Sequence, residues 1–320
     1  MSVMSRQPRI AALGGGTGLA SLLRGLKRSP LDITAIVTVA DDGGSSGRLR
    51  RDLGVLPPGD IRNCLVALAD DESLMGRLFQ HRFADGDLSG HPFGNLFLAA
   101  LAEVTGNFDL AIEECSRVLK IRGRVLPSTL QSIRLWAERE NGELVCGETN
   151  IAAGQGPCRR VWLEPQPMVH PPAITAITEA DLLLLGPGSL FTSVLPHLSV
   201  PRLARAVISC PARRVYVCNV MTQPGETDGF TAADHLEKVL DAAPGGVDVI
   251  VVHEGPLDPA ATAAYAAQGQ EPVRVDHERL EAMGLRVVGA DLAEEGRVVR
   301  HSPEALARVL MELVRGLVER

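Results

Sequence analysis

The stretch Ile10 to Leu26, IAALGGGTGLASLLRGL, constrains the fold of this chain more than any other. It begins with a short apolar run, typical of a buried strand, and continues into a turn that contains Gly14, Gly15, Gly16 and Gly18. Apolar residues then recur at the spacing of a helix packed on one face: Leu19, Leu22, Leu23 and Leu26. We therefore expect a strand, a tight turn and a helix, with Thr17 as the helix cap.

This first glycine turn predicts an anion-binding site. Glycine has no Cβ, so a ligand can approach the backbone closely, and the following helix directs free N–H groups and the positive end of its dipole at the turn. The turn lacks the lysine and the Ser or Thr of a Walker loop, and Leu19 stands where a dinucleotide fingerprint needs its third glycine. The pattern indicates an anion without naming a cofactor, and a turn that only reverses the chain is the alternative.

A second strand is expected over Asp32 to Asp42, DITAIVTVADD, because β-branched residues lead into two carboxylates. Asp41 lies 23 residues after Gly18 (41 − 18), close to the position of the acid that holds a ribose hydroxyl in dinucleotide folds. Asp41 and Asp42 equally suit Mg²⁺ bridging to phosphate oxygens, and a turn or helix-cap role stays open for Asp42. A long connection should follow, from Gly43 to Asp60.

The opening arrangement recurs at Ala180 to Ser193, ADLLLLGPGSLFTS, where a buried strand enters a second glycine turn made by Gly186, Pro187, Gly188 and Ser189. A helix is expected to begin directly after it, so this turn is a second candidate anion site. In a parallel sheet both turns lie at the carboxyl ends of their strands, hence on the same edge. Two such sites on one edge suit a diphosphate, or a phosphate together with a second anionic group.

Further polar residues are candidates for contacts with a base or a sugar. At the end of the strand RVYVCN and in the loop after it these are Asn219, Thr222 and Gln223, although a purely structural loop is the alternative. Thr231 and Asp234 then have the spacing of a capping box for the next helix. Asn95 stands at the start of another predicted helix, HPFGN, where it either contacts a ligand or acts as a cap.

The order of elements predicts one Rossmann-like α/β domain over residues 1–320. About six strand signals alternate with helices, which predicts a doubly wound, mostly parallel sheet between two helical layers, a three-layer α/β/α arrangement. Helical patterns without an intervening strand predict a helical insertion over about 58–122. From about 124 to 164 the pattern is strand-like, and Asn141-Gly142 predicts a hairpin turn, so antiparallel decoration is expected there.

The composition of the chain restricts the classes of partner and the cellular compartment that we expect for it. A net charge of −7 without a long basic run argues against nucleic acid, and the one tight basic cluster, Arg48, Arg50 and Arg51, suits a single phosphorylated ligand. No window holds eighteen apolar residues and the N-terminus carries no leader-like segment, so we expect a cytoplasmic protein without membrane insertion. The six cysteines never occur as C-x-x-C, which is typical of buried thiols in a reducing compartment.

Six stretches, in this order, resemble the gluconeogenesis factor (YvcK-like) family: GGGTGLASLLRGLK, TVADDGGSSGRLR, PPGDIRNCLVALAD, HPFGNLFLAAL, LLLLGPGSLFTSVLP and YVCNVMTQPGETDG. That family lies within the superfamily of 2-phospho-L-lactate transferases (CofD-like). The resemblance implies a Rossmann-like core with a helical insertion and binding of the nucleotide sugar UDP-N-acetylglucosamine. It also implies a regulatory role in cell shape and wall synthesis during growth on gluconeogenic carbon sources, with a regulatory protein as partner and no established reaction.

The ligand contacts that this resemblance implies are Thr17, Asp41, Asn219, Tyr265 and Arg300. The transferase branch shares the glycine turns and the paired acids, so a Mg²⁺-dependent phosphotransferase is the alternative, with Asp41 and Asp42 as catalytic or metal-binding residues. The stretch PPGDIRNCLVALAD departs from that branch near its acceptor site. An NAD(P)-binding protein is a further alternative, and assembly into a homo-oligomer stays open.

Overall fold

The computed structural model describes residues 6–70, 74–294, 296 and 298–318. A seven-stranded sheet with the order β10-β9-β8-β7-β1-β2-β3 forms its centre, and every neighbouring pair in it is parallel. Its strands are β1 (Arg9–Gly14), β2 (Asp32–Val37), β3 (Arg124–Pro127), β7 (Leu182–Leu185), β8 (Arg213–Val217), β9 (Val249–His253) and β10 (Arg286–Ala290). The predicted α/β fold with a doubly wound parallel sheet is confirmed.

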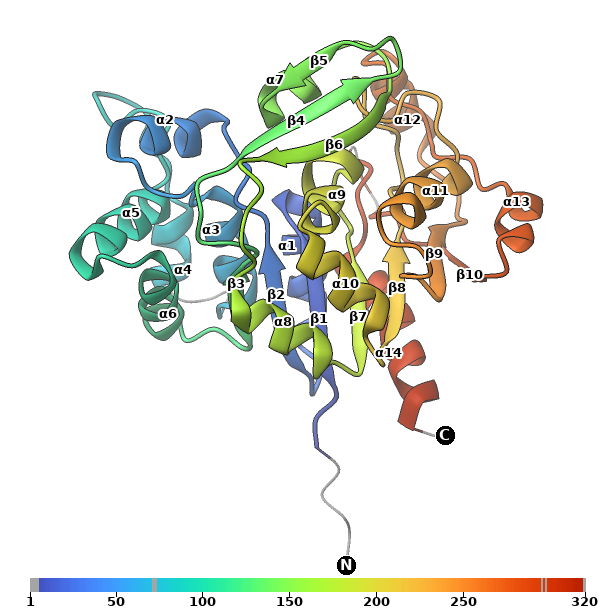
Figure 1. Cartoon of the computed structure of the whole chain (residues 1–320), viewed down its shortest axis with the longest axis horizontal. Helices are drawn as coiled ribbons and strands as arrows, with labels where there is room; N and C mark the ends of the chain where they lie inside the picture. Colours follow the sequence, from blue (N-terminus) through green and yellow to red (C-terminus); the bar gives the residue numbers. More distant parts are fainter. Residues whose placement is uncertain (1–5, 71–73, 295, 297, 319–320) are drawn as a thin grey trace, which may run out of the picture.

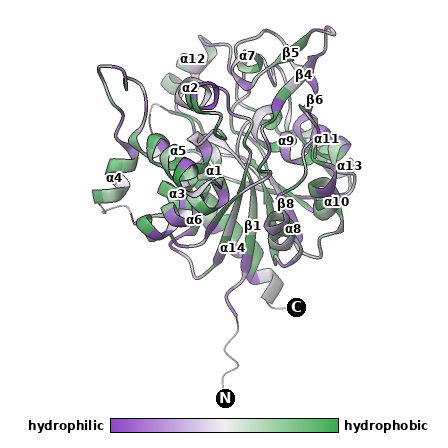
Figure 2. Cartoon of the chain, turned by 60° about the vertical axis from the view of Figure 1, so that its left-hand side comes forward, coloured by the Kyte–Doolittle hydropathy of each residue, from purple (hydrophilic) through white to green (hydrophobic). Residues whose placement is uncertain are grey.

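Helices cover both faces of the sheet (Figure 1). On one face α1 (Gly16–Leu26) packs against α3 (Gly59–Leu68) and α14 (Pro303–Val318). On the other face lie α8 (Pro171–Thr178), α9 (Leu195–Leu198), α10 (Pro201–Ser209) and α11 (Ala232–Ala242). The apolar residues gather along the strands between these layers (Figure 2), and β7 is buried at every position because the sheet is covered twice.

The helices between β2 and β3 are α2 (Gly44–Leu53), α3, α4 (Leu74–Gln80), α5 (Phe93–Thr105) and α6 (Phe108–Leu119). The expectation of a long connection over 43–60 was wrong in part, because α2 occupies its first half. This helix buries few large apolar residues, and a Cβ on Gly47 would lie 2.0 Å from the carbonyl oxygen of Asp42. Because the buried face of α2 consists mainly of small residues, its sequence lacks the stripe of large apolar residues by which an amphipathic helix is predicted.

A second, three-stranded antiparallel sheet has the order β5-β4-β6 and lies above the carboxyl ends of the parallel strands (Figure 1). Its strands are β4 (Arg134–Arg139), β5 (Leu144–Cys146) and β6 (Cys158–Glu164), with α7 (Glu148–Ala152) beside them. The hairpin turn at Asn141-Gly142 is confirmed, with Gly142 at φ +84°. The antiparallel decoration was expected to begin at about residue 124, but it begins only with β4. The preceding strand, β3, pairs in parallel with β2 and completes the main sheet.

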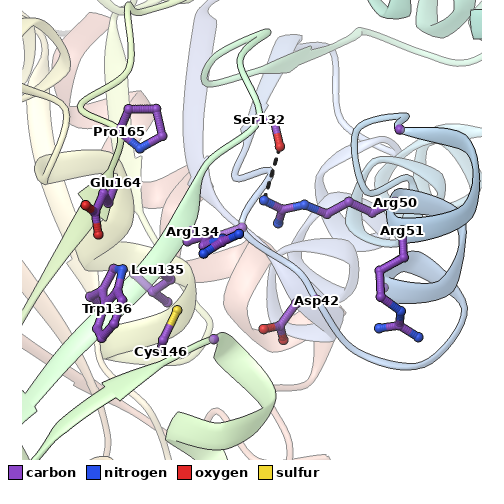
Figure 3. A pocket seen from close by; sticks show the side chains of 14 residues that line it. Asp42, Arg50, Arg51, Ser132, Arg134, Leu135, Trp136, Cys146, Glu164 and Pro165 are labelled. Atoms are coloured by element: carbon purple, nitrogen blue, oxygen red, sulfur yellow. Dashed lines mark hydrogen bonds between the residues drawn. The ribbon is translucent and has the colours of Figure 1, made fainter.

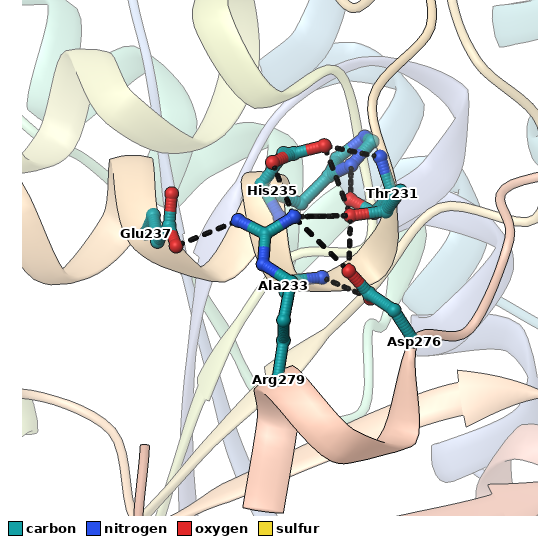
Figure 4. Close-up of polar contacts among 7 residues, drawn as sticks. Thr231, Ala233, His235, Glu237, Asp276 and Arg279 are labelled. Carbon is teal, nitrogen blue, oxygen red and sulfur yellow. Dashed lines mark hydrogen bonds and ion pairs between the residues drawn. The ribbon is translucent and has the colours of Figure 1, made fainter. Parts of the chain in front are cut away.

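The helix α11 begins with the predicted capping box of Thr231 and Asp234. Arg279 at α13 (His277–Ala282) forms ion pairs with Asp234 (2.9 Å) and Asp276 (3.1 Å), and the Thr231 hydroxyl donates to Asp276 at 2.7 Å (Figure 4). These contacts tie the segment before α13 to α11, and the same segment borders the loop after β8. The π-helix η1 (Leu190–Val194), α12 (Pro259–Ala266) and the other elements complete the described chain, in which no helix has the length and apolarity to cross a membrane.

Close packing of α1 on α14 gives a test of the fold. A Cβ on Gly25 would lie 2.1 Å from the carbonyl oxygen of Pro303, so we expect Gly25→Ala to lower the free energy of unfolding by about 1–3 kcal/mol. Gly316 in α14 has no atom closer than 4.0 Å to such a Cβ, and Gly316→Ala should leave stability unchanged or raise it slightly. Urea unfolding measures both; equal stability of the two variants would contradict the packing described.

Candidate functional site

The two glycine turns lie side by side. β1 and β7 are parallel neighbours, with Leu13 opposite Leu185, so the turns that follow them emerge at the same sheet edge. A Cβ on Gly18 would lie 2.8 Å from the carbonyl oxygen of Pro187 and 3.0 Å from the Cα of Gly188. The adjacency that the parallel order predicted is therefore present, and it depends on glycine at position 18.

The first turn differs in detail from the prediction. Gly16 has φ +61°, and Gly15 precedes the helix as its cap residue without a side-chain hydrogen bond. The expectation that Thr17 caps α1 was wrong: Thr17 lies inside the first turn of the helix, with an exposed side chain. Within the described structure no hydrogen bond engages the backbone N–H groups of Thr17 and Gly18. They remain available to a ligand.

A pocket of about 210 Å³, here called the rim pocket, opens at this edge. It combines residues of the first turn, the second turn, the loop after β8, the helix α12 and the segment before α14. Of the residues singled out from the sequence, it is lined by Thr17, Gly18, Gly188, Asn219, Gln223, Tyr265 and Arg300. The fold thus brings residues from five separate segments into one concave surface.

The rim pocket has a polar and an apolar side. The side-chain amide of Asn219 donates to Gln223 Oε1 at 3.0 Å, while Asn219 Oδ1 is buried and has no hydrogen-bond partner. The apolar side belongs to a small cluster, separate from the main core, that contains Val220, Met221, Ala261 and Val299 with Leu257 and Tyr265 packed against it. An unpaired buried acceptor beside an apolar wall suits a flat ring that carries an N–H donor.

Asp60, which the sequence argument missed, lies at the N-terminus of α1. Its carboxylate accepts a hydrogen bond from the Gly16 N–H, while burial, together with the charge of Asp41, raises its pKa to about 6. The chain's own carboxylate therefore occupies part of the place where a ligand anion was expected. Its sequence signal was weak, since one acid before the apolar helix IRNCLVAL resembles an ordinary first-turn acid.

Asp60 belongs to a group of carboxylates at this edge. Burial raises the pKa of Asp41 although Ser46 and the Gly43 N–H donate hydrogen bonds to it. Burial and the nearby charges of Asp60 and Asp41 raise the pKa of Glu148 well above its usual value, and Glu148 Oε2 is buried without a partner. Such a group favours either a bound proton or a bound cation, because like charges in a buried site destabilise one another.

Glu226 is a further buried acid beside the second glycine turn. It accepts a hydrogen bond from the Ser189 hydroxyl, and burial raises its pKa to about 7. Ser189 also accepts from the Thr192 N–H as the cap of η1, so its hydroxyl is committed to protein contacts. Nothing in the sequence marked Glu226, since it follows a glycine in an irregular loop.

Other candidate residues lie outside the rim pocket. Asn95 is buried and donates to Ser45 Oγ at 3.1 Å. Thr222 is buried too, and its hydroxyl accepts from the Glu271 N–H at 2.9 Å. Gly15, Gly16 and Gly186 shape the turns without lining this pocket.

Asp41 and Asp42 do not converge on one point. Asp41 binds the Gly43 N–H at 2.9 Å, whereas Asp42 accepts hydrogen bonds from the N–H and the hydroxyl of Thr149 at 3.0 and 2.9 Å. In the described ranges no three His, Cys, Asp or Glu side chains are placed to hold a metal ion. The pair as it stands does not fit a metal held by protein ligands alone.

Comparisons with known proteins agree with this fold along nearly the whole chain. Residues 10–293 match the sequence model of the family described as 2-phospho-L-lactate transferase CofD. The gluconeogenesis factor of Bacillus subtilis is 49% identical over 316 residues, which cover 98% of this chain and 100% of that protein. The gluconeogenesis factor of Listeria innocua is 41% identical over 313 residues, 96% of each. A crystal structure of a UPF0052 family member from Bacillus halodurans matches with a TM-score of 0.93 at 48% identity, covering 95% of this chain and 100% of that one.

The buried Glu226 predicts a pH dependence of stability. Its pKa in the folded protein, about 7, lies above the ordinary value of 4.5, so between these values the folded state holds a proton that the unfolded state has lost. The contribution of Glu226 to stability therefore falls as pH rises through this window. We expect the stability of Glu226→Gln relative to the parent to increase by roughly 1–3 kcal/mol between about pH 5 and about pH 8.5.

The measurement is urea unfolding at each pH, with Glu103→Gln, an exposed site on α5, as the control. The control should show no such trend. A stability difference for Glu226→Gln that stays constant with pH would contradict the assigned protonation.

Proposed function

Because the chain belongs to the CofD family and, within it, to the gluconeogenesis factors, we propose that it is a regulatory protein that binds a nucleotide-diphosphate sugar of the UDP-N-acetylglucosamine type. The rim pocket is the proposed binding site. The regulated process is cell-wall synthesis and cell shape during growth on gluconeogenic carbon sources, and a protein partner receives the signal.

The convergence of separate segments on the rim pocket, whose lining includes Asn219 with its unpaired Oδ1, is the observation that carries this proposal. The N3–H of uracil is a donor for that oxygen, and the apolar wall at Tyr265 accommodates the flat face of the ring. In this proposal the free N–H groups of Thr17 and Gly18 and the guanidinium of Arg300, all from residues that line the rim pocket, bind phosphate oxygens.

The size of the pocket limits how much of the ligand it encloses. Its volume of about 210 Å³ is below the roughly 300–1,000 Å³ of typical small-molecule sites. We therefore expect the nucleoside to be enclosed and the sugar to extend over the sheet edge toward solvent. Because Asp60 lies beside the first turn, the diphosphate is expected nearer to Gly18 and Arg300 than to Gly16.

Thermal unfolding with added ligands tests the proposal. UDP-N-acetylglucosamine should stabilise the protein, by about 3 kcal/mol at a hundredfold excess over its Kd, whereas GDP and NADH should have little effect. The NADH arm also tests the alternative of an NAD(P)-binding protein. Absence of any shift with the uridine sugar would count against the rim pocket as its site.

Variants locate the binding site. Asn219→Ala and Arg300→Gln should each weaken binding of the uridine sugar about tenfold, since each removes one hydrogen-bonding or charged contact. Arg308→Gln is the matched control, because it removes the same charge from an exposed position on α14 that does not line the rim pocket. Calorimetric titration gives the Kd values; equal affinity of Arg300→Gln and Arg308→Gln would exclude Arg300 from the site.

A Mg²⁺-dependent phosphotransferase is the second candidate, favoured by the carboxylate group of Asp41, Asp60 and Glu148 beside the first turn. Mg²⁺ is commonly held by one or two carboxylates together with substrate phosphates, and Asp41 and Asp60 would supply them here. Bound there, the ion would neutralise charge on the phosphates. The sequence suggested the cluster of Arg48, Arg50 and Arg51 for binding a phosphorylated ligand. In the structure the Arg48 guanidinium already donates a hydrogen bond to the Ser89 carbonyl at 2.8 Å.

This second candidate predicts turnover of a nucleoside diphosphate donor that requires Mg²⁺. The reaction should stop with EDTA and in Asp41→Asn, while Asp241→Asn, at an exposed position on α11, should retain it. Release of the nucleotide, followed by chromatography, is the measurement. Turnover that persists in EDTA would contradict this candidate without affecting the binding proposal.

A further inference from the structure

A second cavity, larger than the rim pocket, lies between α2 and the antiparallel sheet. Its volume is about 830 Å³, and it shares no lining residue with the rim pocket. We call it the arginine cavity, because Arg50 and Arg51 of α2 and Arg134 of β4 line it. The proposed nucleotide sugar makes no use of these residues.

The arginines converge without a matching set of carboxylates. Figure 3 shows the Arg50 and Arg134 side chains extending toward one another across the cavity. Arg50 donates to Ser132 Oγ at 3.2 Å and to the carbonyl oxygen of Ile133, whereas within the described structure Arg51 and Arg134 form no ion pair. Arg50, Arg51 and Arg134 therefore line one cavity, and of their guanidinium groups only that of Arg50 is hydrogen-bonded to protein atoms in the described structure.

Two acids line the same cavity, but neither pairs with these arginines. The Asp42 carboxylate already accepts two hydrogen bonds from Thr149. Glu164 lies opposite Arg134 in the β4–β6 pairing, yet no ion pair joins them. The lining thus carries an excess of positive charge in a chain whose net charge is −7. Because the chain as a whole is negatively charged, its overall field does not attract anions, and any attraction must come from this local group of arginines.

Arg50 and Arg134 repel one another, although the charge of Asp42 offsets this repulsion at Arg50. Burial lowers the pKa of Arg50, and the positive charge of Arg134 lowers it further, while Asp42 acts in the opposite direction. An anion placed between the two guanidinium groups would remove this repulsion and accept several charge-assisted hydrogen bonds.

Across the cavity from α2 lie Trp136 and Pro165, with Glu164 beside them. Trp136 stacks on Trp162 with ring centroids 6.1 Å apart and an interplanar angle of 10°, which fixes its orientation. The indole Nε1 of Trp136, which belongs to this lining, is buried and has no hydrogen-bond partner in the described structure.

We propose that the arginine cavity binds a second small ligand that carries a phosphate or carboxylate group and a flat apolar portion. The anionic group lies among Arg50, Arg51 and Arg134, and the flat portion lies against Trp136. The site is independent of the rim pocket, so the protein has two ligand-binding positions at the carboxyl edge of its sheet.

Tryptophan fluorescence provides a direct test, because Trp136 and Trp162 are the two tryptophans of the chain. In a Trp162→Phe background, the emission comes from Trp136 alone. Phenyl phosphate and benzoate are the probes, and they distinguish a phosphate ligand from a carboxylate ligand; benzyl alcohol is the neutral control. At least one anionic probe should change the emission saturably, and benzyl alcohol should bind at least about tenfold more weakly.

Arginine variants assign the effect to the cavity. Arg51→Gln with Arg134→Gln should weaken the anionic probe about tenfold or more, and both positions are exposed, so the fold is expected to be kept. Arg117→Gln with Arg205→Gln removes the same total charge from exposed helix positions outside the cavity and should leave the affinity unchanged.

Three results would overturn the proposal. The first is no saturable change with either anion at millimolar concentration. The second is binding of benzyl alcohol as tight as that of the anions. The third is the same loss of affinity in both pairs of arginine variants. None of these results bears on the rim pocket, where binding of the uridine sugar is measured separately.

Discussion

The structure depends on the close approach of two glycine turns at the carboxyl edge of one sheet. Because β1 and β7 are parallel neighbours, their turns emerge side by side, and Gly18 packs against Pro187 and Gly188 at a distance that excludes any Cβ. This contact positions the N-terminus of α1 against the loop after β7. The loop after β8 then closes the same edge, so the rim pocket is a direct consequence of strand order.

Charge at this edge is arranged in two opposite ways. The carboxylates of Asp41, Asp60 and Glu148 gather beside the first turn, where burial favours their protonated forms. The arginine cavity, which Asp42 also lines, contains Arg51 and Arg134 without carboxylate partners in the described structure. Negatively charged groups therefore gather beside the first turn, whereas positively charged side chains lie at Arg300 in the rim pocket and at Arg134 in the arginine cavity.

Local features of the chain could be read from its sequence with few errors. The strand, turn and helix from Ile10 to Leu26, the hairpin turn at Asn141-Gly142 and the capping box of α11 each depend on residues a few positions apart. Thr17 was wrongly expected as a cap because the turn supplies Gly15 for that position. The helix α2 was missed because small residues, rather than a stripe of large apolar ones, make its buried face.

The sequence by itself determined the parallel α/β order and the two glycine turns, since apolar periodicity and backbone freedom are encoded within short windows. Only the tertiary structure decided which polar residues share a surface. It joined Thr17, Asn219, Tyr265 and Arg300, and it placed Asn95 and Thr222 among buried hydrogen bonds instead. Burial and long-range charge, which set the protonation of Asp60 and Glu226, exist only after distant segments have packed together, so no local pattern carries them.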